Sequence, residues 1–449
     1  MSKQIHIELP KEVKNIINTI IEAGYEAYAV GGSIRDCLIG RKPGDYDITT
    51  SAMPSDIKRL FRRTIDTGIE HGTVTVMIGD TGYEITTYRI DGKYEDSRHP
   101  KEVVFTRSLT EDLRRRDFTI NAMAYNDEAG LVDPFNGQAD LKDHIIRCVG
   151  DPMERLSEDA LRIMRAVRFS AQLDYEIDEE TKKAIYALAP NLKNISEERI
   201  EVELVKLVTS DHPEKLKDAY EMGITHVFMP EFDVVMKCEQ NNPHHFLSVG
   251  EHTLLSMQNV ENNKYLRLGM LFHDFGKPEC KTTDEDGINH FHGHPLVSKK
   301  MAQNILRRLK FDNQTIQVVS KLVEYHDLDI DPTRKGVRHA INKVGEDIFP
   351  MVLKVKRADL MAQSDYMREE KIGKLDKIEE VYEEVKKLNE CVSLKTLAVN
   401  GGDLIKEGFP SSPVLGKELQ KLLLLVIDDP SLNQRETLLE LAKEDLSNV

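Results

Sequence analysis

The sequence predicts an α+β protein, with a sheet domain at the N-terminus followed by domains made only of helices. Two patterns predict this class: strand-like runs are confined to residues 1–150, and helical periodicity dominates from Asp151 onward. The 449 residues are enough for about three domains at roughly 150 residues each. No apolar run approaches the roughly 20 residues that span a bilayer. Because the first residues also lack a signal-peptide pattern, we expect a cytoplasmic protein.

Each element follows from local pattern. An amphipathic helix is expected at 11–23, before a first strand at 27–30 and a glycine pair. Further strand-like runs lie at 46–49, 73–78, 83–88 and 102–105. Helical periodicity then marks the segments 158–172, 179–188, 197–208, 213–221, 368–388 and 415–427. We expect four domains, namely a sheet domain at 1–150, a helical neck at 151–235, a His-rich helical domain at 236–370 and a helical tail at 371–449.

The charge balance limits how the chain can hold a nucleic acid. Acidic residues outnumber basic ones by 77 to 61, which gives a net charge of −16. An RNA partner therefore requires a local cluster of basic groups. Five cysteines lie far apart without a CxxC pair, which argues against a disulfide framework or a structural zinc site. The expected basic stripe consists of Lys58, Arg59, Arg62 and Arg63, together with the arginines of the motifs below.

The first chemical motif joins a glycine pair to two aspartates in AVGGSIRDCLIGRKPGDYDITT, residues 29–50. Gly31 and Gly32 follow a strand and open a helix, so backbone N–H groups can approach an anion. Arg35 can add a guanidinium fork for a phosphate. Asp45 and Asp47 are two positions apart on the expected strand, which puts both carboxylates on one face. A divalent metal would relieve their repulsion and bridge to a triphosphate.

Each part of this motif taken alone is more often an ordinary surface turn. The combination of a strand, GG, RD and DxD is more specific, and it resembles the nucleotidyltransferase signature of the polymerase β superfamily. In detail it is similar to class II tRNA CCA-adding enzymes and bacterial poly(A) polymerases. The resemblance implies a polymerase β-type nucleotidyltransferase sheet domain, followed by all-helical neck, HD and tail domains.

The second motif is TEDLRRRDFTINAMAYN at 110–126, where three consecutive arginines precede Asp117. A solvated helix face with salt bridges is the plainer interpretation of these charges. The segment resembles the family's RRDFTxNA motif, which implies that Arg116 contacts the incoming nucleotide. Residues 83–100 resemble the strand and flexible loop that precede this motif, and Glu84 there is a candidate third carboxylate.

The third motif is SEDALRIMRAVRFSAQL at 157–173. Asp159 and Arg162 are three positions apart and are expected on one helix face, where an ordinary salt bridge is the plainer interpretation. A carboxylate and a guanidinium held together can also present an acceptor and a donor to a base edge, and such matching discriminates strongly. The segment resembles the family's EDxxR motif. This implies that Asp159 and Arg162 select C or A, and that Arg165 and Arg168 are further nucleotide contacts.

Other segments resemble parts of the same family. Residues 133–141 resemble its hinge motif, 195–204 its neck motif and 399–426 its RNA-gripping tail. In the loop that precedes RRDFT, Asp91 and Arg98 are expected to help the switch from C to A addition. Because this loop looks complete, the resemblance favours full CCA addition over CC addition alone.

A fourth set of residues is scattered over the helical block at about 244–360 and includes the adjacent pair His273–Asp274. A lone helical histidine is usually structural, but this set resembles the pattern of HD phosphohydrolases. Imidazole and carboxylate together suit Mg, Mn, Ni, Fe or Zn. A metal-bound water could hydrolyse phosphate esters there, and 2′,3′-cyclic phosphates or 2′-nucleotides are the implied substrates. The resemblance implies His252, His273, Asp274 and Asp359 as core ligands, with His294 and His326 as extra ligands or phosphate contacts.

Together these resemblances imply that CMP, CMP and AMP are transferred from CTP and ATP to the 3′ end of tRNA, with release of pyrophosphate. Mg²⁺ would be held by Asp45 and Asp47, and a second divalent metal of unknown identity would lie at the HD site. Three alternatives stay open: an A-adding enzyme or poly(A) polymerase, a metallophosphohydrolase that acts mainly through the HD site, and a non-catalytic RNA-binding scaffold.

Overall fold

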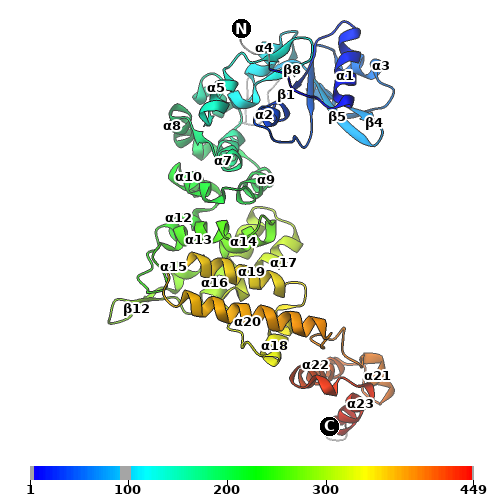
Figure 1. The fold of residues 1–449 in the computed structure, drawn as a ribbon, viewed down its shortest axis with the longest axis vertical. Helices are drawn as coiled ribbons and strands as arrows, with labels where there is room; N and C mark the ends of the chain where they lie inside the picture. Colours follow the sequence, from blue (N-terminus) through cyan, green and yellow to red (C-terminus); the bar gives the residue numbers. More distant parts are fainter. Residues whose placement is uncertain (1–4, 92–102, 447–449) are drawn as a thin grey trace. The chain divides into compact units, whose positions relative to one another are not determined.

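The computed structural model describes residues 5–91 and 103–446 (Figure 1). By their contacts the residues form two compact units, Met1–Pro230 and Glu231–Val449. The first unit holds a seven-stranded sheet and a set of helices, and the second consists of helices and a short hairpin. The predicted α+β class with a helical C-terminal part is therefore confirmed. The finer domain boundaries at 150 and 370 stay predictions.

The large sheet has the strand order β3-β4-β5-β2-β1-β8-β9. β2 and β5 are parallel, whereas the other neighbouring pairs are antiparallel. Because β2 lies between β1 and β5, the residues at the start of β2 lie near both of them. The strands are β1 (Ala27–Val30), β2 (Asp47–Thr50), β3 (Thr64–Gly68), β4 (Thr73–Ile78), β5 (Thr81–Thr87), β8 (Ala124–Asn126) and β9 (Gly130–Val132). Two short pairs complete the unit, β6 (Arg89–Asp91) with β7 (Val103–Phe105) and β10 (Ile145–Ile146) with β11 (Glu176–Ile177).

The helices of the first unit bury apolar faces of the expected period. In α1 the buried residues are Val13, Ile16, Ile17 and Ile20, which form one stripe that packs against β1. With α1 (Lys11–Glu22), the sheet is accompanied by α2 (Gly32–Leu38), α3 (Pro54–Leu60), α4 (Leu109–Arg114), α5 (Gly137–Asp143), η1 (Ile69–His71) and η2 (Thr119–Asn121). The helices that follow are α6 (Pro152–Glu158), α7 (Leu161–Leu173), α8 (Glu179–Leu188), η3 (Ala189–Asn194), α9 (Glu197–Val208), η4 (Pro213–Lys215), α10 (Leu216–Glu221) and α11 (Thr225–Phe228).

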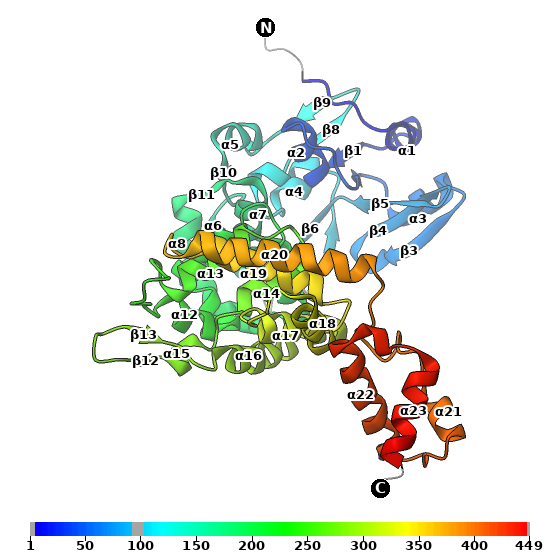
Figure 2. The same cartoon turned by 60° about the horizontal axis from the view of Figure 1, so that its bottom comes forward.

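The second unit begins within α12 (Pro230–Met236) and is almost entirely helical. The long helix α20 packs against α18 and α19, and the tail helices α21–α23 share a core that includes Leu404, Leu422 and Leu438 (Figure 2). The first part contains α13 (Val249–Gln258), α14 (Lys264–Phe272), α15 (Lys277–Cys280), the hairpin β12 (Thr282–Thr283) with β13 (Asn289–His290), α16 (His294–Arg308) and α17 (Asn313–Tyr325). The rest contains α18 (Arg334–Val344), α19 (Phe349–Ala362), α20 (Arg368–Lys387), α21 (Gly401–Lys406), α22 (Pro413–Asp428), η5 (Pro430–Leu432) and α23 (Arg435–Leu446).

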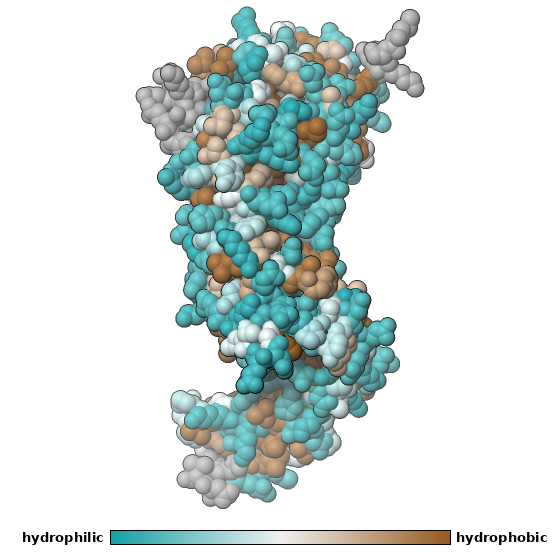
Figure 3. Space-filling model, turned by 90° about the vertical axis from the view of Figure 1, so that its left-hand side faces the viewer, coloured by the Kyte–Doolittle hydropathy of each residue, from teal (hydrophilic) through white to brown (hydrophobic). Residues whose placement is uncertain are grey.

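One face of the protein is mainly polar. On the face shown in Figure 3, hydrophilic residues predominate and hydrophobic residues occur in small, separate groups. Single exposed apolar side chains such as Tyr186 and Leu296 are ordinary for a folded protein. Within 5–91 and 103–446, none of the helices combines the length and the apolarity that crossing a membrane requires.

Candidate functional site

Three carboxylates lie near one another where β2 begins. Asp47 is the first residue of β2. Asp45 lies in the loop before β2, which corrects the prediction that both aspartates lie on the strand. Glu84 lies on β5, the parallel neighbour of β2. Desolvation raises the pKa of Asp47, Arg116 opposes this shift, and the like charges of Asp45 and Glu84 add to it. Burial is the largest cause of this shift and the two like charges add to it, and a bound divalent cation would stabilise the charged carboxylates.

The glycine turn lies directly against Arg116. Gly31 has φ +80°, a conformation that favours glycine, and a Cβ at this position would lie 3.0 Å from Arg116 Nη1. Burial lowers the pKa of Arg116, whereas Asp112 and Asp47 oppose the shift. Among the described residues, the buried Nε of Arg116 has no hydrogen-bond partner. Arg116 therefore lies beside the glycine turn, and its charge interacts with that of Asp47.

Arg35 also lies beside the turn, but protein partners occupy its guanidinium. Its Nη1 donates to Asn121 Oδ1 at 2.8 Å. Its Nε and Nη2 contact Asp36 Oδ1 at 2.9 and 2.8 Å. A Cβ on Gly32 would lie 3.6 Å from Arg35 Nη2. The Arg35 side chain therefore lies at the glycine turn. A phosphate would have to share these donors.

Asp117 connects the sheet to the helix that carries the third motif. It is 7% exposed, and it accepts hydrogen bonds from its neighbour Phe118 N at 2.8 Å and from Asn121 Nδ2 at 3.2 Å. Arg165 Nε, on α7, donates to Asp117 Oδ2 at 2.7 Å. Although burial favours the neutral acid, Arg165 and Asn121 hold the pKa of Asp117 well below its usual range. This ionised pair fixes α7 to the RRD segment.

The third motif is not one continuous helix, which corrects the prediction of a helix over 158–172. Asp159 has extended backbone angles, φ −136° and ψ 105°, and separates α6 from α7. Its Oδ1 accepts from Leu161 N at 3.0 Å, so the side chain caps the start of α7. Its Oδ2 accepts from Arg199 Nη2 on α9 at 2.8 Å. Asp159 is therefore held at a helix junction and is not part of a helical stripe.

Arg162 likewise has partners that the sequence did not indicate. We expected Asp159 and Arg162 to act as an acceptor–donor pair. In the structure Arg162 Nη1 donates to Glu158 Oε2 at 2.5 Å and Nη2 donates to Arg115 O at 2.9 Å. The two side chains meet across a cavity of about 230 Å³ that Arg116, Arg165 and Arg199 also line.

Arg168 does not line this cavity. It forms an ion pair at 2.6 Å with Glu203 of α9, and both side chains are at most 8% exposed. Its guanidinium lies 3.8 Å from the centre of the Phe169 ring, which Arg35 and Arg165 also approach at 5.1 and 5.3 Å. The structure therefore gives Arg168 a role in joining α7 to α9, and its contact with a nucleotide stays a prediction.

Two residues of this site were missed from the sequence. Arg199 lies in the segment that resembled a neck motif, but only the fold brings it to Asp159. Phe169 is the ring on which three arginines converge, and a phenylalanine in a helix gives no signal for such a role.

The predicted basic stripe is partly neutralised. Lys58 forms an ion pair with Asp66 at 2.8 Å, and Arg59 pairs with Asp56. Of the expected loop residues, Arg98 and the side chain of Asp91 lie outside the described residues.

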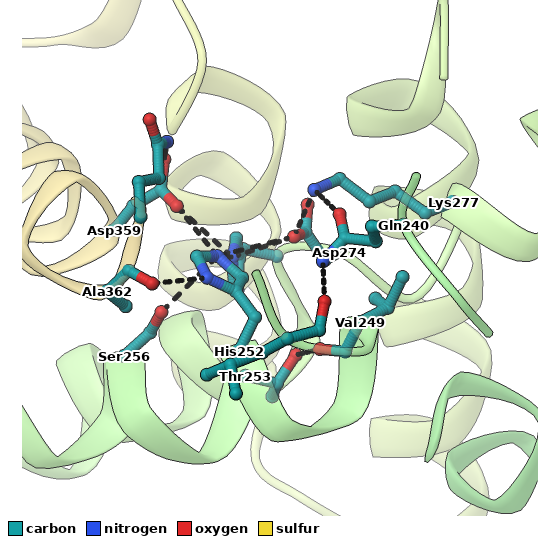
Figure 4. Close-up of polar contacts among 12 residues, drawn as sticks. Gln240, Val249, His252, Thr253, Ser256, Asp274, Lys277, Asp359 and Ala362 are labelled. Atoms are coloured by element: carbon teal, nitrogen blue, oxygen red, sulfur yellow. Dashed lines mark hydrogen bonds and ion pairs between the residues drawn. The ribbon is translucent and has the colours of Figure 1, made fainter. Parts of the chain in front are cut away.

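In the second unit, four imidazoles and two carboxylates converge from α13, α16, α19 and the ends of α14 and α17. Figure 4 labels three of these residues, His252, Asp274 and Asp359. His252 Nε2 lies 2.8 Å from Asp359 Oδ1 and 3.3 Å from His273 Nε2. Asp274 Oδ2 lies 3.2 Å from His273 Nε2 and 2.7 Å from Lys277 Nζ. Although burial opposes it, His273 and Lys277 hold the pKa of the Asp274 carboxyl well below its usual range. An ionised, buried carboxylate among imidazoles is a donor set that fits a transition metal ion.

The remaining two histidines, His294 and His326, lie near Oδ1 of the Asp274 carboxylate. His294 Nε2 lies 3.3 Å from Asp274 Oδ1 and 3.2 Å from His326 Nε2. Burial lowers the pKa of His326 to about 3, so this imidazole is neutral at neutral pH. A cavity of about 310 Å³ is lined by four of the six side chains, Asp274, His294, His326 and Asp359, and also by Lys277, Lys371 and His292. The structure thus brings together all six residues that resembled HD ligands, next to a cavity that also contains two lysines.

The chain matches known protein families over most of its length. Residues 27–147 match the poly A polymerase head domain, 174–236 the RNA and SrmB-binding site of polymerase A, and 283–442 the tRNA nucleotidyltransferase domain 2.

Individual relatives agree with these matches. A CCA-adding enzyme of Limosilactobacillus reuteri is 36% identical over 433 residues, which is 96% of this chain and 95% of that protein. A CCA-adding enzyme of Levilactobacillus brevis is 51% identical over 228 residues, but this match spans only 50% of this chain and 57% of that relative. The crystal structure of the Bacillus stearothermophilus CCA-adding enzyme in complex with CTP is 29% identical, covers 98% of both chains and superimposes with a TM-score of 0.73.

We predict that the Arg168–Glu203 pair stabilises the first unit. The Glu203→Gln variant leaves the Arg168 charge buried without its partner, which should lower the free energy of unfolding by about 3 kcal/mol. The double variant Arg168→Met with Glu203→Leu removes both charges and should recover most of this loss. Urea unfolding followed by circular dichroism measures both effects. A Glu203→Gln variant as stable as the unchanged protein would show that the pair contributes nothing.

Proposed function

Because the chain belongs to the family of CCA-adding enzymes, we propose that it adds C, C and A to the 3′ end of tRNA from CTP and ATP, without a nucleic-acid template, and releases pyrophosphate. One observation carries the proposal: a single cavity of about 230 Å³ is lined by Arg116, which adjoins the crowded carboxylates, and by Asp159 and Arg162. The Bacillus stearothermophilus relative was crystallised in complex with CTP, which supports the proposal that a nucleotide binds in this cavity. We also propose a cytoplasmic location, where free cysteines such as all five here are the rule.

Nucleotidyltransferases of this family use a divalent metal, and we propose Mg²⁺ held by Asp45 and Asp47, with Glu84 as a third carboxylate. The hard oxygen donors and the charge crowding at Asp47 fit this ion. Bound there, Mg²⁺ would neutralise the triphosphate and favour ionisation of the primer 3′-OH. The Arg116 side chain lines the cavity and is 19% exposed, and its guanidinium then binds phosphate oxygens. Because Gly31 has no side chain, the Arg116 guanidinium can lie directly against the glycine turn.

Base choice follows from hydrogen-bond complementarity. C and A both carry an amino group, N4 in C and N6 in A, at the position where U and G carry a carbonyl oxygen. The Asp159 carboxylate accepts from such an amino group, and Arg162 donates to the adjacent ring nitrogen. G or U would place an acceptor against Asp159 and leave buried polar groups unpaired. Arg199 holds the Asp159 carboxylate at 2.8 Å and so orients this acceptor.

Nucleotide addition is tested on three tRNAs that lack CCA, CA or A. With Mg²⁺ and both nucleotides, we expect extension to CCA and then a stop, resolved at single-nucleotide length. The double variant Asp45→Asn with Asp47→Asn should lose at least about three orders of magnitude in rate, because it removes the charges that hold the metal. Asp80→Asn, in the turn between β4 and β5, is the matched control and should keep full activity.

Two outcomes would refute the proposal. Incorporation of CTP by the Asp45/Asp47 double variant would show that the site lies elsewhere. Addition of A alone would show that the protein is an A-adding enzyme, and an unlimited A tail would show that it is a poly(A) polymerase.

We predict that Asp159→Ala loosens base choice more than it slows phosphoryl transfer. Without the carboxylate, the repulsion against the carbonyl oxygens of G and U disappears, so discrimination against GTP and UTP should fall about tenfold or more. Competition between the four nucleotides on a tRNA that lacks CCA measures this ratio. Unchanged discrimination in an active variant would contradict the reading of the base by Asp159.

A second function is favoured by the histidine cluster of the second unit. We propose that it binds a divalent metal and hydrolyses phosphate esters, with 2′,3′-cyclic phosphates or 2′-nucleotides as substrates. The supporting observation is the adjoining cavity of about 310 Å³, in which Lys277 and Lys371 offer positive charge to a phosphate.

We predict that this second site works independently of nucleotide addition. The double variant His273→Ala with Asp274→Ala removes donors that lie in a separate compact unit, so CCA addition should stay within about twofold of the unchanged enzyme, while metal binding at the cluster is lost. The tRNA assay and hydrolysis of a 2′,3′-cyclic nucleotide are run on the same preparation. Loss of CCA addition in the folded variant would contradict independence.

A further inference from the structure

Asp112, on α4, is a carboxylate with no exposed surface. It precedes Arg115 and Arg116 by three and four positions, so one helical turn brings both arginines toward it. Although burial favours the neutral acid, these two arginines and the Thr49 hydroxyl hold the pKa of Asp112 below its usual range. Because a buried charge is costly unless it is paired, the contacts of its two oxygens show what this residue does.

One oxygen, Oδ1, binds Arg115 and the backbone. Nε and Nη2 of Arg115 each lie 3.0 Å from Asp112 Oδ1. The backbone N–H of Arg89, at the start of β6, donates to the same oxygen at 3.3 Å. Two nitrogens of the Arg115 guanidinium are therefore committed to Asp112.

The other oxygen, Oδ2, contacts the sheet and Arg116. It accepts from the Thr49 hydroxyl at 2.9 Å. Thr49 lies two positions after Asp47 on β2, so the two side chains project from the same face of the sheet. Arg116 Nη2 lies 3.8 Å from Oδ2, which is an ion-pair distance and too long for a hydrogen bond. Asp112 therefore attracts the Arg116 guanidinium without occupying its N–H groups.

The Arg116 charge depends on Asp112. Burial lowers the pKa of Arg116, and among the carboxylates that oppose this shift Asp112 contributes most, ahead of Asp47. A divalent cation bound at Asp47 would offset the charge of that second carboxylate. Asp112 is then the counter-charge that stays with Arg116 when the metal is bound.

We propose that Asp112 is a positioning residue for nucleotide addition, which holds the Arg116 guanidinium beside the glycine turn for the triphosphate of the incoming nucleotide. With one oxygen it occupies Arg115, and with the other it is attached to β2 through Thr49. Of these two adjacent arginines, Arg116 is thus the one left for phosphate. This inference rests on the nucleotide addition proposed above and adds the residue that prepares Arg116 for it.

Equilibrium binding tests this role without turnover. The Kd values of the full chain for CTP, UTP and pyrophosphate are measured by calorimetry in the presence of Mg²⁺. Asp112→Asn keeps the shape of the side chain and removes its charge, so all three Kd values should rise about tenfold. The ratio of the Kd values for CTP and UTP should stay unchanged, because the proposed base readers keep their own partners.

A double-mutant cycle shows whether Asp112 acts through Arg116. Arg116→Gln removes the guanidinium and should by itself weaken the binding of pyrophosphate. In that background Asp112→Asn should change the Kd for pyrophosphate by less than about twofold. An additive loss would show that Asp112 acts on something other than Arg116 and would overturn the proposal.

Asp178→Asn is the matched control. Asp178 also accepts from a threonine hydroxyl, that of Thr181 at 3.3 Å, and from an arginine, Arg147 Nη1 at 2.6 Å, but it lies at the start of α8. All three Kd values of this variant should equal those of the unchanged protein.

A second variant applies if Asp112→Asn does not fold, as judged by circular dichroism. Thr49→Val keeps the Asp112 charge and removes the hydroxyl that fixes it, so the Kd for pyrophosphate should rise about threefold.

The outcomes separate this inference from the function on which it rests. Unchanged binding of pyrophosphate by the folded Asp112→Asn variant, or by Thr49→Val in its place, would overturn the inference. A lower preference for CTP over UTP with intact pyrophosphate binding would also overturn it, because Asp112 would then act on the base-reading side chains. If the unchanged protein binds CTP but does not extend tRNA, the proposed nucleotide addition fails, while the Kd values still decide the role of Asp112.

Discussion

The ion pair of Asp117 with Arg165 is the contact on which the proposed nucleotidyltransferase site depends. Asp117 follows Arg116, the residue beside the glycine turn, whereas Arg165 lies one turn after Arg162, which we propose as a base reader. Together with the hydrogen bond from Arg162 to Arg115 O, this contact of 2.7 Å holds α7 against the RRD segment. Because the Asp117 carboxylate is buried, loss of Arg165, which is itself 34% exposed, would leave a buried charge without its main counter-charge.

The side chains that we propose as base readers are held by protein partners in the same way. Asp159 is oriented by Arg199, and Arg162 by Glu158 and a backbone carbonyl. Such partners fix a donor and an acceptor before a nucleotide arrives, which lowers the cost of ordering them on binding. The second unit uses the same device with different chemistry, since four backbone carbonyls orient four imidazoles around Asp274.

Local motifs could be predicted from the sequence because their chemistry depends on neighbours in the chain. The order of Gly31, Asp47 and Asp117 indicated the nucleotidyltransferase sheet, and strands such as β4 and helices such as α8 lie where periodicity placed them. Contacts between distant segments could not be predicted in this way. Nothing local shows that Arg168 pairs with Glu203 or that Asp159 pairs with Arg199, because both partners lie on another helix. The break at Asp159 was missed because, in the sequence, an aspartate that caps α7 cannot be distinguished from an aspartate inside a helix.

The most direct test of the account is a double-mutant cycle on Asp117 and Arg165, with the ratio of kcat/KM for CTP to that for UTP as the readout. If the pair positions the base-reading helix, Asp117→Asn and Arg165→Gln should each lower both this ratio and the rate, and the double variant should be no worse than either single one. Additive losses, or full discrimination in a folded Asp117→Asn variant, would show that the sheet and the base-reading helix do not depend on this contact.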